Sequence, residues 1–294
     1  MRPSIVIAVV AALALAAPIA AQPEPDGIAA GIMAEALKRA HDNVPARVSN
    51  YVLTLTSGPV RTELYVHRDG DGWEVEEQDD APLADLFKSM IVWPRLAAEH
   101  RAGATDTSEI ARDARYVTSD TVGDRVAHVL RARVPGLAVE TMDIPDSAYV
   151  AVDARTRQLL RVVAAADVEP SAGGAMINGG RVTLQMTFSD HAAVNGVTVP
   201  RRLHVLLRMQ ANLTDEQRAA MRDGLTAQLA APADPSQTAV QTRMLMEMFL
   251  RMLDGETMEI SADVEDVRVN TGPPAWLIAQ DPYAAGKSAS DASP

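Results

Sequence analysis

A strand–turn–strand pattern between Arg181 and Gln210 constrains the fold of this chain more than any other feature. In each half, apolar residues alternate with polar ones, and alternation at every second position places them on one face of a half-buried strand. Between the halves, Asn195-Gly196 supplies the positive φ angles of a tight hairpin turn. The apolar faces of the two strands consist of Val182, Leu184, Met186, Phe188, Leu203, Val205, Leu207 and Met209.

An apolar face of this width must be covered by helices, a second sheet or a ligand. Further alternating runs occur at 51–55, 60–68, 125–134 and 257–269. Apolar residues at helical spacing occur at 27–41, 82–100 and 213–254. We therefore expect a mainly β (α+β) fold, in which a curved antiparallel sheet or half-barrel of about ten strands has helices covering its concave face.

The segment 213–254 carries clear helix signals. Thr214-Asp215-Glu216-Gln217 is a capping box, with Thr214 as the N-cap and Gln217 reaching back to it. A second helix is predicted from about Thr238 to Leu253, and Gly255 is placed to end it. This pattern predicts a pair of helices inserted between two strands of the sheet.

The N-terminal sequence is typical of a secretory signal. Arg2 precedes the apolar run Ile5–Ala17, and small residues lead to a cleavage site predicted after Ala21. The alternative is an uncleaved anchor. The chain has no Cys, which excludes an acylated lipoprotein, disulfides and thiol chemistry. We expect a signal peptide at 1–21, one domain at 22–283 with a helical insertion at about 213–254, and a disordered tail at 284–294.

Two groups of residues resemble a known superfamily. Phe188-Ser189-Asp190, Val194-Asn195-Gly196-Val197 and Val199-Pro200 are similar to the strand–turn–strand signature of LolA/LolB-like proteins. Tyr149–Asp153, with Thr156 and Leu159-Leu160-Arg161, resembles the hairpin that precedes it. The resemblance covers roughly residues 28–278. It implies a periplasmic half-barrel that shelters lipoprotein acyl chains, as a lipid carrier or an envelope sensor, and the helix pair at 213–254 departs from that pattern.

Charge and composition exclude several classes of function. A net charge of −12 argues against binding nucleic acid or adsorbing strongly to anionic lipid. Aromatic residues make up 4% of the chain, so stacking platforms for bases or sugars are hard to build. The 13 Met residues instead favour a pliable apolar lining.

The sequence shows no catalytic signature and no cofactor motif. It lacks a G-x-S-x-G elbow and an H-E-x-x-H motif, and its histidines show no metal-ligand spacing. Asp69-Gly70-Asp71-Gly72 is interpreted as a turn, because the regular ligands of a calcium loop are missing. Met244, Met248 and Met252 could bind Cu(I) through their thioethers, but Met at helical spacing is more typical of a core or an apolar groove. We expect no metal, no cofactor and no enzymatic activity.

The expected function is therefore binding of a lipid or lipoprotein acyl chain in the periplasm, without catalysis. Burial of an acyl chain yields about 0.8 kcal/mol per CH₂, so a dry groove is sufficient. The alternative is an envelope-stress sensor or regulatory scaffold whose sheet binds a protein partner. The predicted groove consists of Leu184, Met186, Phe188, Leu203, Val205, Leu207, Met209, Met244, Met248, Phe249 and Met252.

Overall fold

The computed structural model describes residues 27–69, 72–78, 107–133, 147–168, 180–230 and 237–280. Three predicted segments lie outside the described residues: the signal peptide at 1–21, the helix at 82–100 and the tail at 284–294. They stay predictions from the sequence.

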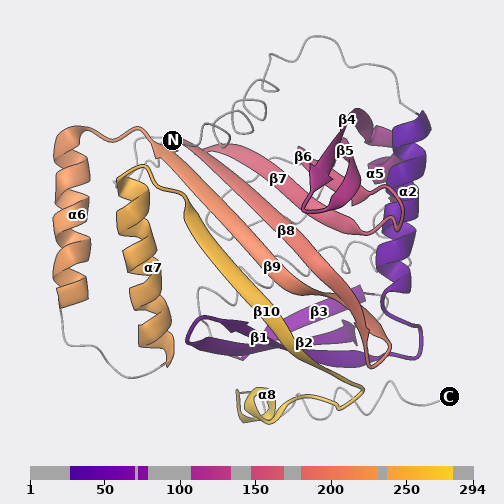
Figure 1. Cartoon of the computed structure of the whole chain (residues 1–294). Coiled ribbons are helices and arrows are strands. Elements are labelled where there is room, and N and C mark those ends of the chain that lie inside the picture. Colours follow the sequence, from indigo (N-terminus) through magenta and orange to yellow (C-terminus); the bar gives the residue numbers. More distant parts are fainter. Residues whose placement is uncertain are drawn as a thin grey trace.

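The described strands form one open, ten-stranded antiparallel sheet (Figure 1), as the sequence predicts. Strands β3 and β4 are its two edges, and the order between them is β3-β2-β1-β10-β9-β8-β7-β6-β5-β4. Neighbours along the chain mostly pair with each other, and β10 is inserted between β1 and β9. The strands are β1 (Asn50–Ser57), β2 (Val60–Asp69), β3 (Gly72–Glu77), β4 (Arg115–Val122), β5 (Arg125–Arg133), β6 (Ser147–Asp153), β7 (Leu159–Val168), β8 (Gly180–Val194), β9 (Val197–Ala211) and β10 (Met258–Val269).

The β8–β9 hairpin has the predicted turn and the predicted face. Val194 pairs with Val197, and the two residues between them, Asn195 and Gly196, have φ angles of 50° and 87°. Positive φ at both turn residues matches the right-handed twist of the strands. The buried side chains that alternate along this hairpin are Val182, Leu184, Met186, Phe188, Val197, Val199, Leu203 and Val205.

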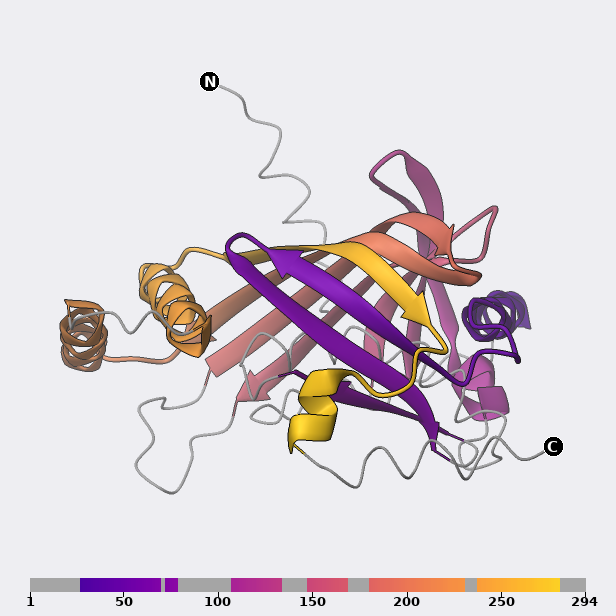
Figure 2. The same ribbon diagram turned by 90° about the horizontal axis from the view of Figure 1, so that it is seen from below.

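The main core lies between the inner face of the sheet and helix α2 (Gly27–Asp42). Apolar residues repeat along α2 at helical spacing, so one stripe of the helix is buried against the strands. Short helix α5 (Thr107–Asp113) packs beside α2, and both lie at one end of the curved sheet in Figure 2. The buried stripe of α2 consists of Ala29, Ile32, Met33, Ala36, Leu37 and Ala40.

The predicted helix pair is present as α6 (Asp215–Ala230) and α7 (Gln237–Leu253). Its capping box forms: the amide of Gln217 donates to the Thr214 hydroxyl at 3.2 Å, and the Thr214 amide donates to Oε1 of Gln217 at 2.9 Å. Gly255 ends α7 with a φ angle of 82°, which a glycine adopts without strain.

Helix α7 of this pair packs against the core through Met244, Met248 and Met252. Both helices lie at the end of the sheet opposite α2 (Figures 1 and 2). No residue of α6 is buried. Helix α7 is buried at its C-terminal end, through Met252 and Leu253, while Phe249 is 42% exposed.

After β10, the chain forms the short helix α8 (Ala275–Gln280). Its Trp276 indole donates to Oε2 of Glu63 on β2 at 3.0 Å. This hydrogen bond attaches the end of the described chain to the sheet.

Candidate functional site

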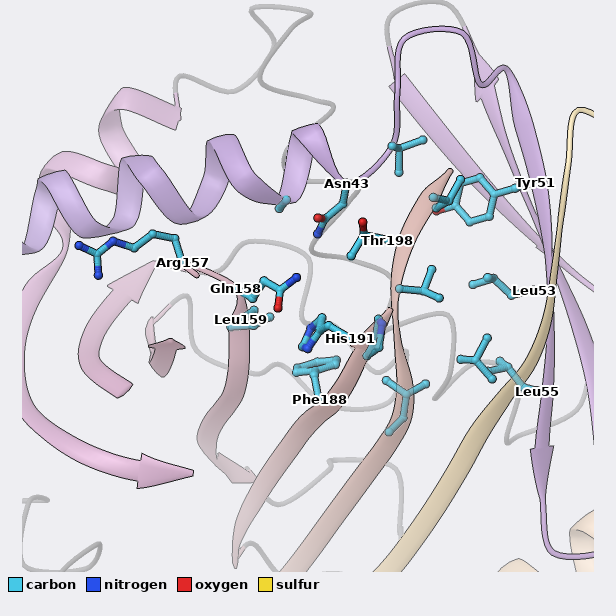
Figure 3. A pocket seen from close by; sticks show the side chains of 17 residues that line it. Asn43, Tyr51, Leu53, Leu55, Arg157, Gln158, Leu159, Phe188, His191 and Thr198 are labelled. Atoms are coloured by element: carbon cyan, nitrogen blue, oxygen red, sulfur yellow. The ribbon is translucent and has the colours of Figure 1, made fainter. Parts of the chain in front are cut away.

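A cavity lies between the C-terminal end of α2, strand β1 and the β8–β9 hairpin (Figure 3). It offers about 70 Å³ of room for water-sized molecules, whereas a single water needs only about 10–15 Å³. Most of its lining is apolar, as in typical ligand sites. The apolar lining includes Val44, Leu53, Leu55, Leu159, Phe188, Leu203 and Val264.

The topology explains how distant segments meet at this cavity. Strand β10 separates β1 from β9, so Leu53 and Leu55 face the hairpin across one strand. The β1–β10 ladder shifts register between Thr54 and Leu55, and such bulges bend the strands and increase their twist. The bend therefore lies beside the cavity.

A hydrogen bond between main-chain groups holds the C-terminal end of α2 against the β8–β9 hairpin at the cavity. The amide of Thr198 in β9 donates to the carbonyl oxygen of Asn43 at 2.8 Å, directly after the end of α2. Val44 is buried next to it, and Pro45 prevents the helix from continuing. The C-terminal end of α2 is thereby attached to the hairpin beneath it.

The polar lining lies on one side of the cavity. Figure 3 shows Asn43, Gln158, Thr198 and His191 on that side, while Leu53 and Leu55 lie on the other. Two polar atoms in this group, Oδ1 of Asn43 and Nδ1 of His191, are buried without a hydrogen-bond partner among the described residues. Buried polar atoms are nearly always paired, so two such atoms in one cavity call for an explanation.

His191 is uncharged at neutral pH. Its burial lowers its pKa from 6.5 to about 4, because the imidazolium would lose hydration. Repulsion from Arg125 acts in the same direction, attraction to Asp153 and Asp190 opposes it, and Arg39 adds a smaller repulsion. The imidazole can therefore donate one hydrogen bond and accept one, but it offers no charge to the cavity.

Asp153 organises the turn that brings Gln158 to the cavity. Its Oδ1 accepts hydrogen bonds from the amides of Arg155 at 2.8 Å and Thr156 at 2.6 Å, and its Oδ2 lies 3.3 Å from the guanidinium of Arg125. Burial alone would raise the pKa of Asp153, but the hydrogen bonds from Thr156 and Arg155 and the charge of Arg125 outweigh it, so its pKa lies below the ordinary value. An ionised Asp at the start of a turn is a common way to hold its backbone.

Two of the predicted groove residues, Phe188 and Leu203, line this cavity. Among the others, Leu184, Met186, Val205 and Met252 are part of the core, and Leu207, Met244 and Met248 pack against it. Phe249 is exposed, and Met209 pairs with Val182 in the β8–β9 ladder. The structure therefore places the α7 Met residues away from the cavity rather than over it.

The structure also brings together one group with metal-ligand chemistry. Nε2 of His67 lies 3.8 Å from Glu74 and 3.9 Å from Glu76, and all three side chains are partly exposed. The spacing of these residues in the sequence matches no metal-binding motif, but His67 is directly opposite Glu74 in the β2–β3 ladder. Exposed imidazole and carboxylate groups commonly meet in this way on a sheet surface without a metal.

Comparisons with known proteins give structural similarity but no sequence match. No family model matches the chain, and no curated protein does. A domain from Vibrio parahaemolyticus, described as a candidate outer membrane lipoprotein-sorting protein, has a TM-score of 0.40 and 9% identity over 87% of this chain and 98% of that domain. A DUF1329 family protein from Desulfovibrio piger has a TM-score of 0.37 and 9% identity over 90% of this chain and 99% of that one.

A LolA superfamily protein from Nitrosomonas europaea has a TM-score of 0.35 and 10% identity over 82% of this chain and 94% of that one. The fold is similar to LolA-like structures. Among the described helices, none has the length and apolar character needed to cross a membrane.

Proposed function

We propose that this protein binds the apolar chain of a lipid or lipoprotein in the cavity beneath α2, and that it is a carrier rather than an enzyme. The observation that carries this proposal is an apolar space between the inner face of the sheet and α2. Its wall includes the aliphatic and aromatic side chains of Leu53, Leu55, Phe188 and Leu203. Each methylene group moved from water into such a site contributes about 0.8 kcal/mol, so a short stretch of chain provides useful affinity.

The volume of the cavity limits the length of apolar chain that binds without a rearrangement of the protein. Its room of about 70 Å³ accommodates a short apolar segment, and a longer chain requires the cavity to open further. The predicted secretory signal supports a periplasmic location for this activity, in a compartment where lipids and acylated proteins must cross an aqueous space.

The test is binding of N-phenyl-1-naphthylamine, an uncharged apolar dye that fluoresces strongly when it leaves water. We expect saturable binding that dodecyl amphiphiles displace. Val264 lies in the cavity wall and is 2% exposed, so Val264→Phe should fill part of the space and weaken dye binding at least fivefold.

Val126 is 60% exposed on β5 and is not among the cavity residues, so Val126→Phe is the matched control and should bind dye like the unsubstituted protein. Absence of dye binding to the folded, lipid-stripped protein would refute the proposed function. If Val264→Phe and Val126→Phe bind the dye with equal affinity, the dye binds outside this cavity.

A further inference from the structure

The polar side of the cavity has a specific hydrogen-bonding character. Oδ1 of Asn43 is an acceptor without a donor, and Nδ1 of His191 lacks a partner, among the described residues. The side chain of Gln158, which is 8% exposed, lies on the same side. An unpaired buried polar atom destabilises the ligand-free protein, so these atoms gain from a ligand that pairs with them.

Two guanidinium groups near this side have partners of their own. The guanidinium of Arg157 bonds to Oε2 of Glu35 at 2.5 Å and to the carbonyl oxygen of Ala154 at 2.7 Å. The guanidinium of Arg125 faces the Asp153 carboxylate. An ionised carboxylate entering the cavity would therefore lose its hydration and meet mainly uncharged partners, which is unfavourable.

A hydroxyl group has the complementary chemistry. It donates one hydrogen bond, which the Asn43 oxygen can accept, and its own oxygen accepts from an imidazole N–H. If the His191 tautomer carries its proton on Nε2, Nδ1 is an acceptor as well, and a head group with two free hydroxyls donates one hydrogen bond to Nδ1 and one to the Asn43 oxygen. An ester or ether oxygen only accepts and leaves the Asn43 oxygen unpaired.

We propose that the cavity selects uncharged amphiphiles with a free hydroxyl group, such as monoacylglycerols, over ionised fatty acids of the same chain length. This inference rests on the proposed function and names its ligand class. The hydroxyl head pairs with Asn43 and His191, and the chain extends toward Leu53 and Leu55 on the apolar side.

The experiment is displacement of N-phenyl-1-naphthylamine at pH 7.5, below the micelle concentrations, by three competitors with the same twelve-carbon chain. Monolaurin carries free hydroxyls, methyl laurate has an ester without a hydroxyl, and laurate is ionised. We expect monolaurin to displace the dye at concentrations at least tenfold lower than either of the others.

Two variants assign this preference to the polar atoms. Asn43→Leu and His191→Phe should each reduce the ratio between monolaurin and methyl laurate to threefold or less, while dye binding is retained. Asn212→Leu makes the same change at an exposed position after β9 and should leave the ratio unchanged.

The outcomes separate the two proposals. Dye binding that laurate displaces as well as or better than monolaurin overturns the hydroxyl inference and leaves the carrier function in place. A tenfold preference that persists in both Asn43→Leu and His191→Phe overturns the assignment to these side chains. No dye binding at all refutes the carrier function, and the hydroxyl inference falls with it.

Discussion

Replacing Asn43 by Leu should make the ligand-free protein more stable. Oδ1 of Asn43 is buried without a partner among the described residues. An unsatisfied buried polar group costs about 1–3 kcal/mol, and an apolar side chain of similar size removes that cost while adding apolar contact in the cavity. We expect the free energy of unfolding to rise by about 1 kcal/mol, which corresponds to roughly 2–4 °C in Tm for a chain of this size.

Asn50 provides a matched control, because both the oxygen and the nitrogen of its side-chain amide are hydrogen-bonded. It is 7% exposed, its Oδ1 accepts from the Gly272 amide at 3.1 Å, and its Nδ2 donates to Ser49 Oγ at 3.0 Å. Asn50→Leu should lower the free energy of unfolding by about 1–3 kcal/mol, since it leaves the Gly272 amide without its acceptor.

The assay is urea unfolding of lipid-stripped protein, followed by far-UV circular dichroism. We expect the change in the free energy of unfolding to have opposite signs for the same substitution at positions 43 and 50. If Asn43→Leu loses as much stability as Asn50→Leu, the Asn43 oxygen has a partner, and its assignment to a ligand has no basis.

Three further predictions follow from the core, the imidazole and the N-terminus. Leu184 is 3% exposed, so Leu184→Asp should unfold the protein or cost at least about 4 kcal/mol, whereas Thr183→Asp on the other face should be mild in the same urea assay; equal effects would mean that the strand register is different. His191 binds its proton at about pH 4 when folded and at 6.5 when unfolded, so the unfolded chain takes up protons first and stability falls as pH drops from 6.5 to 4. That component is at most about 3 kcal/mol, and His191→Phe should remove it from a pH series of urea midpoints; an unchanged pH profile would contradict the burial argument. Intact mass of the protein from a periplasmic fraction should show Gln22 as the first residue, and retention of residues 1–21 in membranes would refute cleavage.

The sequence predicts the sheet well, because strand patterns and turn chemistry are local. The alternation at Val182–Phe188 and the Asn195-Gly196 turn determine the faces and the register of β8 and β9. The Thr214–Gln217 capping box likewise predicts the start of α6. These signals need no knowledge of what lies across the sheet.

The site was only partly predictable, because its walls come from segments that meet only after the sheet forms. Phe188 and Leu203 lie in the predicted groove, but Leu53 and Leu55 reach them through the insertion of β10 beside β1. Helix periodicity shows which face of α7 is apolar and says nothing about where that face docks. Asn43 and His191 carry no sequence signal, since their importance comes from buried atoms that have no partner among the residues that the structure describes.

The central claim is that an apolar chain binds beneath α2 rather than under α7. Photo-crosslinking tests it most directly, with a dodecyl amphiphile that carries a diazirine in its chain and with peptide mass spectrometry to locate the bound label. We expect labelling of Leu53, Phe188 or Leu203, and we expect Val264→Phe to reduce it. Labelling confined to Met244, Met248 or Phe249 of α7, or no saturable labelling at all, would contradict it.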